Sequence, residues 1–127
     1  MKVLDSTVLI DLLRGKEEVK KIIEKDQYLT TQINIYEVIS GLFAKKVTSS
    51  KILQAQELFE NIRVLPLNDS STVMAASING DLISRGEIIE DCDCLTAGIA
   101  LSHNINIIVT KNKKHFSRIK GIEVETY

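Results

Sequence analysis

The fold is decided first by residues 3–11, VLDSTVLID, where the chain changes from one kind of secondary structure to another. Residues 2–4 form a short apolar run that stops at Asp5, which predicts a β-strand. Asp5 or Ser6 can cap a helix that follows. Gly15 is suited to end that helix. The apolar residues between these points recur at helical spacing: Val8, Leu9, Leu12 and Leu13.

The same alternation of strand and helix continues outward from this unit. The expected strands are residues 2–4, 28–31, 63–67, 105–109 and 122–125. The helices expected after the first are residues 17–25, 33–46, 49–61, 69–85, 94–103 and 112–119. Such alternation predicts a parallel sheet with helices on both faces, joined by right-handed crossovers. We therefore expect one α/β domain over residues 1–127, with three α/β/α layers and a central parallel sheet of four to five strands.

Side chains that bear oxygen atoms adjoin several of these strands. Asp5 comes directly after the first strand, and Asn112 follows the strand at residues 105–109. Asp93 stands just before the helix that precedes the latter strand, and Glu37 lies about one turn into a helix among mostly apolar neighbours. Because ligand sites of parallel sheets lie beyond the carboxyl ends of the strands, we expect these side chains to meet there.

The meeting of these groups matters more than any one of them. Taken singly, Asp5 and Asp93 suit helix caps, and Asn112 suits a turn. Together, carboxylates without an arginine partner repel one another, which raises their pKa values unless a cation intervenes. Mg²⁺ and Mn²⁺ prefer such oxygen ligands, activate a bound water and stabilise charge during in-line attack on phosphate. The pattern therefore predicts phosphodiester hydrolysis by a Mg²⁺-activated water, with Mn²⁺ as a plausible substitute.

Composition excludes several other classes of protein. Apolar residues make up 44% and charged residues 26% of the sequence, which is typical of a globular protein rather than a disordered one. No apolar stretch approaches the roughly 20 residues that span a bilayer, so we expect no membrane association and a cytoplasmic protein. The net charge is −1, so any affinity for nucleic acid must come from local patches.

Four blocks of the sequence resemble the PIN-domain ribonuclease family, and specifically the VapC-type toxins of type II toxin–antitoxin systems. They occur in the order and spacing of that family and cover nearly the whole chain. The blocks are VLDSTVLID at residues 3–11, NIYEVISG at residues 34–41, DCLTAGIAL at residues 93–101 and IVTKNKKHF at residues 108–116. The resemblance implies a PIN-like fold and a Mg²⁺-dependent endoribonuclease.

The resemblance also assigns roles to particular residues. It implies that Asp5, Glu37 and Asp93 are the catalytic, metal-binding acids. Ser6 stands where the family has a hydroxyl residue, and Thr110 matches the threonine before a fourth acidic position. That position is Asn112 here, which adds no charge, so one metal ion is expected rather than two. Two further acids have lesser roles: Asp91 is a candidate additional ligand, and Asp11 is expected to face solvent or the rim of the site.

A basic cluster lies beside the expected site and could hold RNA phosphates, although charge runs are usually a solvated surface. Its candidate RNA-binding residues are Lys111, Lys113, Lys114 and Arg118. The neighbouring His115 is a possible general base, but a structural role is favoured.

The resemblance implies an RNA substrate, a homodimer and a cognate VapB-like antitoxin that blocks the acidic site. Apolar residues that either line its groove or belong to the core are Tyr36, Leu42, Phe43, Leu58 and Phe59. Two alternatives stay open: a PIN-fold nuclease that processes RNA without an antitoxin, and a non-catalytic PIN-fold binding module.

Overall fold

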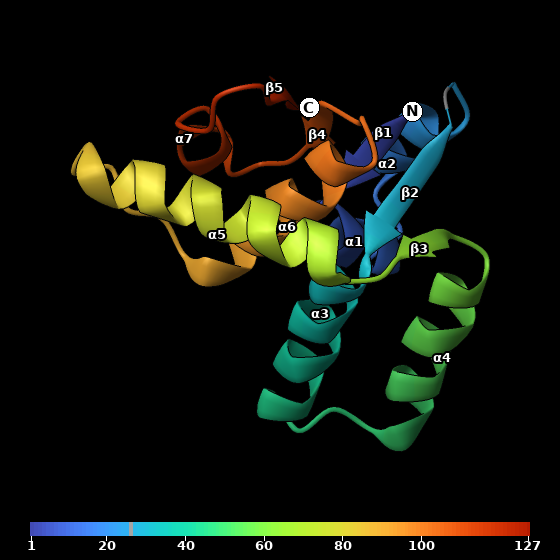
Figure 1. Ribbon diagram of the computed structural model, residues 1–127. Coiled ribbons are helices and arrows are strands. Elements are labelled where there is room, and N and C mark those ends of the chain that lie inside the picture. The colour runs from blue at the N-terminus through green and yellow to red at the C-terminus, as the bar shows by residue number, and fades with distance from the viewer. Residues whose placement is uncertain (26) are drawn as a thin grey trace.

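A five-stranded, entirely parallel sheet forms the centre of the computed structural model, which describes residues 1–25 and 27–127 (Figure 1). The strands, in chain order, are β1 (Lys2–Leu4), β2 (Tyr28–Thr31), β3 (Arg63–Leu65), β4 (Ile107–Val109) and β5 (Glu123–Glu125). Their spatial order is β3-β2-β1-β4-β5, so β1 is central and β3 and β5 are the edges. This confirms the expected parallel sheet.

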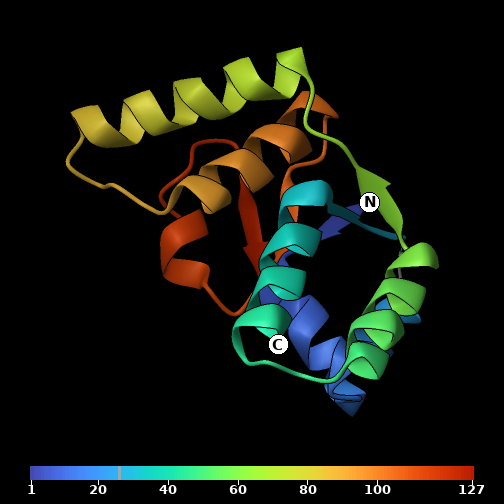
Figure 2. The same ribbon diagram turned by 90° about the horizontal axis from the view of Figure 1, so that it is seen from below.

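Helices cover both faces of the sheet and complete three layers, as expected from the sequence (Figure 2). They are α1 (Ser6–Leu13), α2 (Glu17–Ile23), α3 (Gln32–Ala44), α4 (Ser49–Glu60), α5 (Asp69–Ser84), α6 (Asp91–Ser102) and α7 (Lys113–Phe116). In the part of the chain that the structure describes, none of these helices is both long and apolar enough to cross a bilayer.

Successive residues of the central strands point to opposite faces and so supply two apolar cores. Val3 and Ile108 pack into a core beneath α5, α6 and α7, whereas Leu4 and Val109 pack into one beneath α1 to α4. All of them are at most 1% exposed. Burial on both faces explains why these strands appear in the sequence as unbroken apolar runs.

Helices α4 and α5 start at residues 49 and 69 as expected, and the residue just before each start is its N-cap. α4 is capped by Thr48, whose hydroxyl oxygen accepts from the Lys51 backbone N–H. α5 is capped by Asn68, whose side chain accepts from the backbone N–H of Ser71 while the Ser71 hydroxyl accepts from that of Asn68. This reciprocal pair satisfies two donors at once.

The start of α6 differs from the expectation, and the difference bears on the acidic residues. α6 begins at Asp91 after Glu90, so Asp93 lies within the first turn instead of preceding the helix. The following strand begins at Ile107 instead of residue 105, because the backbone N–H of Ile105 still bonds to the Ala100 carbonyl oxygen at the end of α6.

Helices α5 and α6 lie against each other along their lengths, and a glycine allows their close approach (Figures 1 and 2). A Cβ atom added at Gly98 would lie 2.6 Å from the Cβ of Ala75 and 2.7 Å from its backbone nitrogen. Because backbone atoms cannot move aside like a flexible side chain, the absence of a side chain at Gly98 sets the distance of α6 from α5.

We expect Gly98→Ala to destabilise the protein by about 1–3 kcal/mol, because the added methyl group overpacks the contact between α5 and α6. Gly80→Ala is the matched control in α5, where an added Cβ meets nothing within 4 Å. That substitution should stabilise the helix by about 0.5–1 kcal/mol. Urea denaturation of both variants measures the difference, and equal stabilities would contradict the close approach.

Candidate active site

Asp5 lies at the carboxyl end of β1, and both of its carboxylate oxygens accept hydrogen bonds. Oδ1 accepts from the Thr7 backbone N–H at 3.0 Å and from the Thr7 hydroxyl at 2.5 Å, which also makes Asp5 the N-cap of α1. Oδ2 accepts from the Thr110 hydroxyl at 2.6 Å. The side chain is buried, and burial raises its pKa although these hydrogen bonds oppose the shift. Asp5 is thus both a helix cap and a poorly hydrated acid.

Glu37 lies on α3, whose start is held by a buried polar pair. The Thr31 hydroxyl caps the helix by accepting from the Asn34 backbone N–H, and it donates to Asn34 Oδ1 at 2.6 Å. One turn later, Glu37 is half-buried, and its Oε1 is buried without a hydrogen-bond partner among the described residues. This unpartnered oxygen is unusual because buried polar atoms are nearly always hydrogen-bonded.

The pKa of Glu37 is raised to about 7, first by burial and then by the negative charges of Asp93 and Asp5. A hydrogen bond with Ser6 opposes the shift, and the charge of Glu90 adds to it. Glu37 therefore lies in the electrostatic field of both other predicted acids.

Asp93 lies on α6 and is bound by two residues from the segment after β4. Its Oδ2 lies 3.0 Å from His115 Nδ1 and accepts from the Asn112 side-chain amide at 3.5 Å. The tautomer of His115 with a proton on Nδ1 makes it a donor to Asp93. Burial raises the pKa of Asp93, and the bond and charge of His115 oppose the shift. His115 thus contacts a predicted acid directly, which the preference for a structural role did not anticipate.

The segment after β4 is attached to Asp5 through two threonine hydroxyls. The Asn112 backbone N–H donates to the Thr110 hydroxyl oxygen at 2.8 Å, and the Lys111 backbone N–H donates to that of Thr7 at 3.0 Å. Thr110 therefore touches the predicted site, as its position in the sequence suggested. Thr7 is an additional residue that the sequence reasoning missed. Its signal was a hydroxyl two residues after a capping aspartate.

The structure makes the predicted acids electrostatic neighbours without preassembling them as ligands. Among residues 1–25 and 27–127, no three His, Cys, Asp or Glu side chains are arranged as they stand to hold one metal ion. The oxygens of Asp5 are already engaged, whereas Oε1 of Glu37 is unengaged. A set of oxygen donors with an unpaired buried member suits the chemistry of a hard divalent cation.

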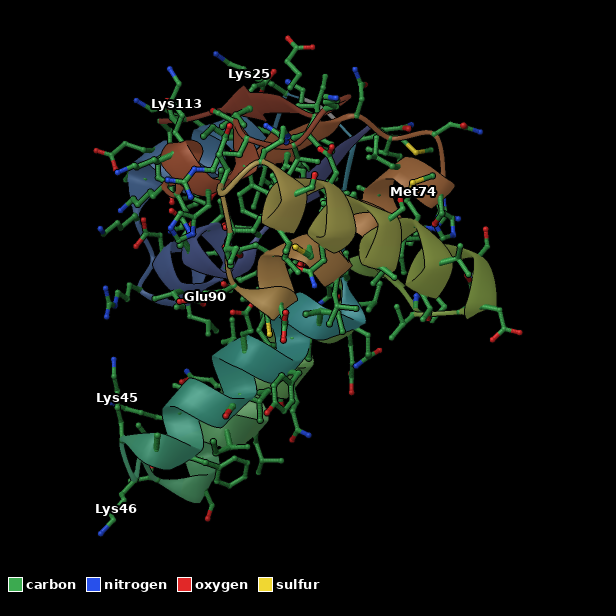
Figure 3. The ribbon with its side chains drawn as sticks, turned by 60° about the vertical axis from the view of Figure 1, so that its left-hand side comes forward. Lys25, Lys45, Lys46, Met74, Glu90 and Lys113 are labelled. Carbon is green, nitrogen blue, oxygen red and sulfur yellow. The ribbon has the colours of Figure 1, made fainter. Side chains whose placement is uncertain are left out.

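A different acid from the expected one adjoins this group. Asp91 is exposed and lines a hollow between α5 and α6 together with Asn79 and Cys94. It is two helical positions from Asp93 and therefore faces another way. Glu90 instead acts on the pKa values of both Glu37 and Asp93. Figure 3 labels Glu90 near the start of α6, a helix that is in contact with α3.

The basic residues beside the site divide into two kinds. Arg118 donates from its guanidinium to the Ile88 carbonyl oxygen at 3.1 Å, and the ammonium of Lys111 pairs with Asp11. Lys113 and Lys114 are exposed, and Lys113 projects outward from the molecule (Figure 3). Of the two expectations for Asp11, solvent or the rim of the site, the first is wrong, because the residue is 3% exposed. The sequence offered no sign that two lysines and a tyrosine surround it.

The apolar residues considered for a binding groove fall into two groups, exposed residues and residues of the core. Tyr36 and Phe43 are 65% and 64% exposed on α3, whereas Phe59 is 5% exposed and belongs to the core. Leu42 and Leu58 pack against that core while partly exposed. A second hollow, between α1 and α3, reaches the acidic group. Its lining residues are Ile10, Leu13, Arg14, Glu37, Val38, Gly41, Leu42 and Lys45.

Comparison with known proteins gives consistent matches along the chain. A family model described as PIN domain matches residues 2–122. Ribonuclease VapC1 of Rickettsia felis is 27% identical, over 98% of this chain and 94% of that protein. Ribonuclease VapC1 of Methanocaldococcus jannaschii is 29% identical, over 98% of this chain and 85% of that protein. Among solved structures, VapBC2 from Rickettsia felis bound to a DNA fragment from its promoter has a TM-score of 0.88 at 19% identity, covering 99% of this chain and 98% of that one.

The raised pKa of Glu37 predicts how stability depends on pH when no metal is bound. Between its ordinary pKa of 4.5 and its folded value of about 7, the folded protein retains a proton that the unfolded chain releases. The free energy of unfolding therefore falls as pH rises through this window. Glu37→Gln removes this fall. The difference in Tm, variant minus parent, should therefore be more positive at pH 8 than at pH 5.

Solvent screening reduces the effect of a half-buried group, so we expect about 1 kcal/mol, or roughly 3–6 °C in Tm. Thermal unfolding in the presence of a chelator measures the shift. The exposed Glu57→Gln on α4 serves as the control and should show the same difference from the parent at both pH values. If the difference in Tm between Glu37→Gln and the parent is the same at both pH values, the burial of this acid is contradicted.

Proposed function

The chain belongs to the PIN domain family, and on this premise we propose that it is a metal-dependent endoribonuclease of the VapC type, neutralised by a VapB-like antitoxin. Relatives that match it over nearly their whole lengths are named ribonucleases.

One observation carries the proposal: the charges of Asp93 and Asp5 both raise the pKa of Glu37, whose Oε1 is buried without a hydrogen-bond partner among the described residues. Asp5, Glu37 and Asp93 would hold Mg²⁺, or Mn²⁺ in its place. When bound, the ion would activate water and offset charge on the phosphate under attack. Because Asn112 is neutral, three carboxylates supply the charge, which favours one ion over two.

The surrounding residues have the task of orienting these acids. Thr7 and Thr110 hold the two oxygens of Asp5, and His115 and Asn112 hold Oδ2 of Asp93. Such outer partners set the orientation of metal ligands and their basicity. Ser6 does the same for Glu37, whose Oε1 is left free to bind or to accept a proton.

We assign the capture of RNA phosphates to Lys113 and Lys114. Both are exposed and follow Asn112 at the edge of the acidic group. Lys111 and Arg118 are less suited to this role, because their side chains are engaged with Asp11 and with the Ile88 carbonyl oxygen. We propose the cytoplasm as the compartment in which the enzyme meets its RNA substrate.

For the antitoxin, the hollow between α1 and α3 offers an apolar surface that leads to Glu37. A peptide segment lying there, with one basic side chain near the acids, would both bind and block the site. The exposed α3 residues Tyr36 and Phe43 line a separate hollow on another face of that helix, which offers a partner a second apolar surface. A structurally similar protein was solved as a VapBC complex, which supports a partner of this kind. We also propose that the chain forms a homodimer, which measurement of its molecular mass in solution tests.

We expect Asp93→Asn and Glu37→Gln to lower RNA cleavage at least about 100-fold, since even outer partners of metal ligands contribute 10–100-fold. Both changes keep the shape of the side chain and remove its charge. Cleavage of RNA by purified protein in Mg²⁺, with a chelator as the blank, measures activity, and Mn²⁺ titration measures metal affinity. Expression of the parent without an antitoxin should arrest growth, and either substitution should relieve the arrest.

Asp91→Asn is the matched control, because it removes the same charge from the same helical turn on another face. It should retain activity to within about twofold. Undiminished cleavage by Asp93→Asn and Glu37→Gln would refute the catalytic assignment, and an equal loss in Asp91→Asn would make Asp91 a ligand.

Lys113→Gln combined with Lys114→Gln should raise KM for RNA and weaken its dependence on salt, while kcat stays unchanged. Removing two phosphate contacts reduces the slope of log affinity against log salt by roughly 1.4 on single-stranded RNA. Steady-state kinetics between 50 and 200 mM salt measures both quantities. An unchanged slope of log affinity against log salt would show that Lys113 and Lys114 do not contact the RNA phosphates.

A further inference from the structure

Asp11 is a buried carboxylate that the proposed reaction does not use. It lies on α1 and is 3% exposed. Its Oδ2 accepts from the Tyr127 hydroxyl at 2.7 Å and also pairs with the ammonium of Lys111, while Oδ1 pairs with Lys16 at 3.2 Å. Burial raises the pKa of Asp11, but its bonds with Lys111, Tyr127 and Lys16 outweigh that and lower it to about 2. The carboxylate is therefore ionised and fully engaged.

Lys111 connects this buried charge to the candidate active site. Its ammonium pairs with Asp11 and lies over the Tyr127 ring, 5.3 Å from the centroid. Its backbone N–H donates to the Thr7 hydroxyl, which in turn donates to Asp5. The same residue is thus attached to α1 at two points four residues apart, which is about one helical turn.

The neighbours of Lys111 in the chain are the residues that touch the predicted acids. Thr110 donates to Asp5, and Asn112 donates to Asp93. A shift of the backbone at position 111 would therefore move both contacts together. A loop attached only by hydroxyl bonds has more freedom than one also held by an ion pair with a buried partner.

We propose that Asp11, Lys111 and Tyr127 form a clamp of positioning residues that holds the segment 110–112 against α1 and so keeps Thr110 and Asn112 in register with the predicted acids. The inference rests on the proposed function for its catalytic consequence, although the clamp itself is a matter of structure. It assigns Lys111 to orientation of the site rather than to binding of RNA.

The chain contains a matched control for this proposal. Lys16 and Lys111 both pair with Asp11, and their side chains are 40% and 42% exposed. Only Lys111 extends the pairing into the segment beside the acids. Lys16→Met and Lys111→Met therefore remove similar ion pairs from one carboxylate, and they differ in which part of the chain is released.

The test compares kcat and KM for RNA cleavage in these two variants, at a temperature well below the Tm of each. Lys111→Met should lower kcat at least about tenfold with KM within twofold of the parent, as expected when a partner of the acids is displaced. Lys16→Met should leave both constants within about twofold. Tyr127→Phe, which removes the hydroxyl bond and keeps the ring, should lower kcat to a smaller extent than Lys111→Met.

Amide hydrogen exchange provides a readout that does not depend on catalysis. The backbone amide at position 111 should exchange faster in Lys111→Met and in Tyr127→Phe, and at the parent rate in Lys16→Met. If the parent cleaves no RNA, the proposed function fails while this exchange pattern still tests the clamp.

Three outcomes would overturn the clamp. A higher KM with unchanged kcat in Lys111→Met would assign Lys111 to phosphate binding. Equal losses of kcat in Lys16→Met and Lys111→Met would indicate a general effect of uncovering Asp11. Unchanged exchange at position 111 in Lys111→Met and Tyr127→Phe would show that the threonine hydroxyls and the bond from the Thr110 backbone N–H to Glu125 hold the segment without the clamp.

Discussion

The arrangement of side chains at the carboxyl edge of this sheet depends on electrostatic repulsion between carboxylates that are partly removed from water. Burial raises the pKa of Asp5, Glu37 and Asp93, and the charges of the other two acids contribute to the shift at Glu37. Such a group persists only if hydrogen bonds or a cation offset the cost of ionisation. Asp5 and Asp93 receive hydrogen bonds, but Oε1 of Glu37 receives none among the described residues. Compensation is therefore least complete at Glu37.

The side chains that compensate the buried charge of Asp5 add no positive charge of their own. Asp5 is held by the neutral hydroxyls of Thr7 and Thr110 rather than by lysine or arginine. A cation in their place would neutralise the acid and compete with a metal ion for it. The nearby lysines pair instead with Asp11, near the other end of the same helix. One short helix thus keeps an acid with neutral partners apart from an acid with charged partners.

Much of the fold followed from the sequence, because apolar periodicity determines which residues enter a sheet or cover it. The strand at residues 28–31 and the end of α1 before Gly15 were predicted closely. Helix caps were harder to predict, since Thr48 and Asn68 cap α4 and α5 although the adjacent Ser49 and Asp69 are polar residues that can also cap a helix. That choice depends on which side chain reaches a backbone N–H, and composition does not specify it.

For the candidate site too, the sequence predicted some features, but it did not specify which side chains far apart in the chain come into contact. The parallel topology indicated that Asp5, Glu37 and Asp93 would approach one another, and their mutual effect on the pKa of Glu37 agrees with this. The environment of Asp11 could not be predicted, because Tyr127 lies 116 positions away in the chain. The contact between His115 and Asp93 likewise depends on how α7 turns after β4, which no local pattern specifies.

The two outer strands have a consequence for self-association. Each is only three residues long, and β3 begins with Arg63 while β5 carries Glu123 and Glu125. An incoming strand of another molecule would have to bring its backbone alongside these charges over a very short ladder. Short, charged borders of this kind discourage open-ended stacking of sheets into fibrils. Pairing between sheet edges is therefore disfavoured, which leaves the helical faces as the surfaces better suited to contact with another molecule.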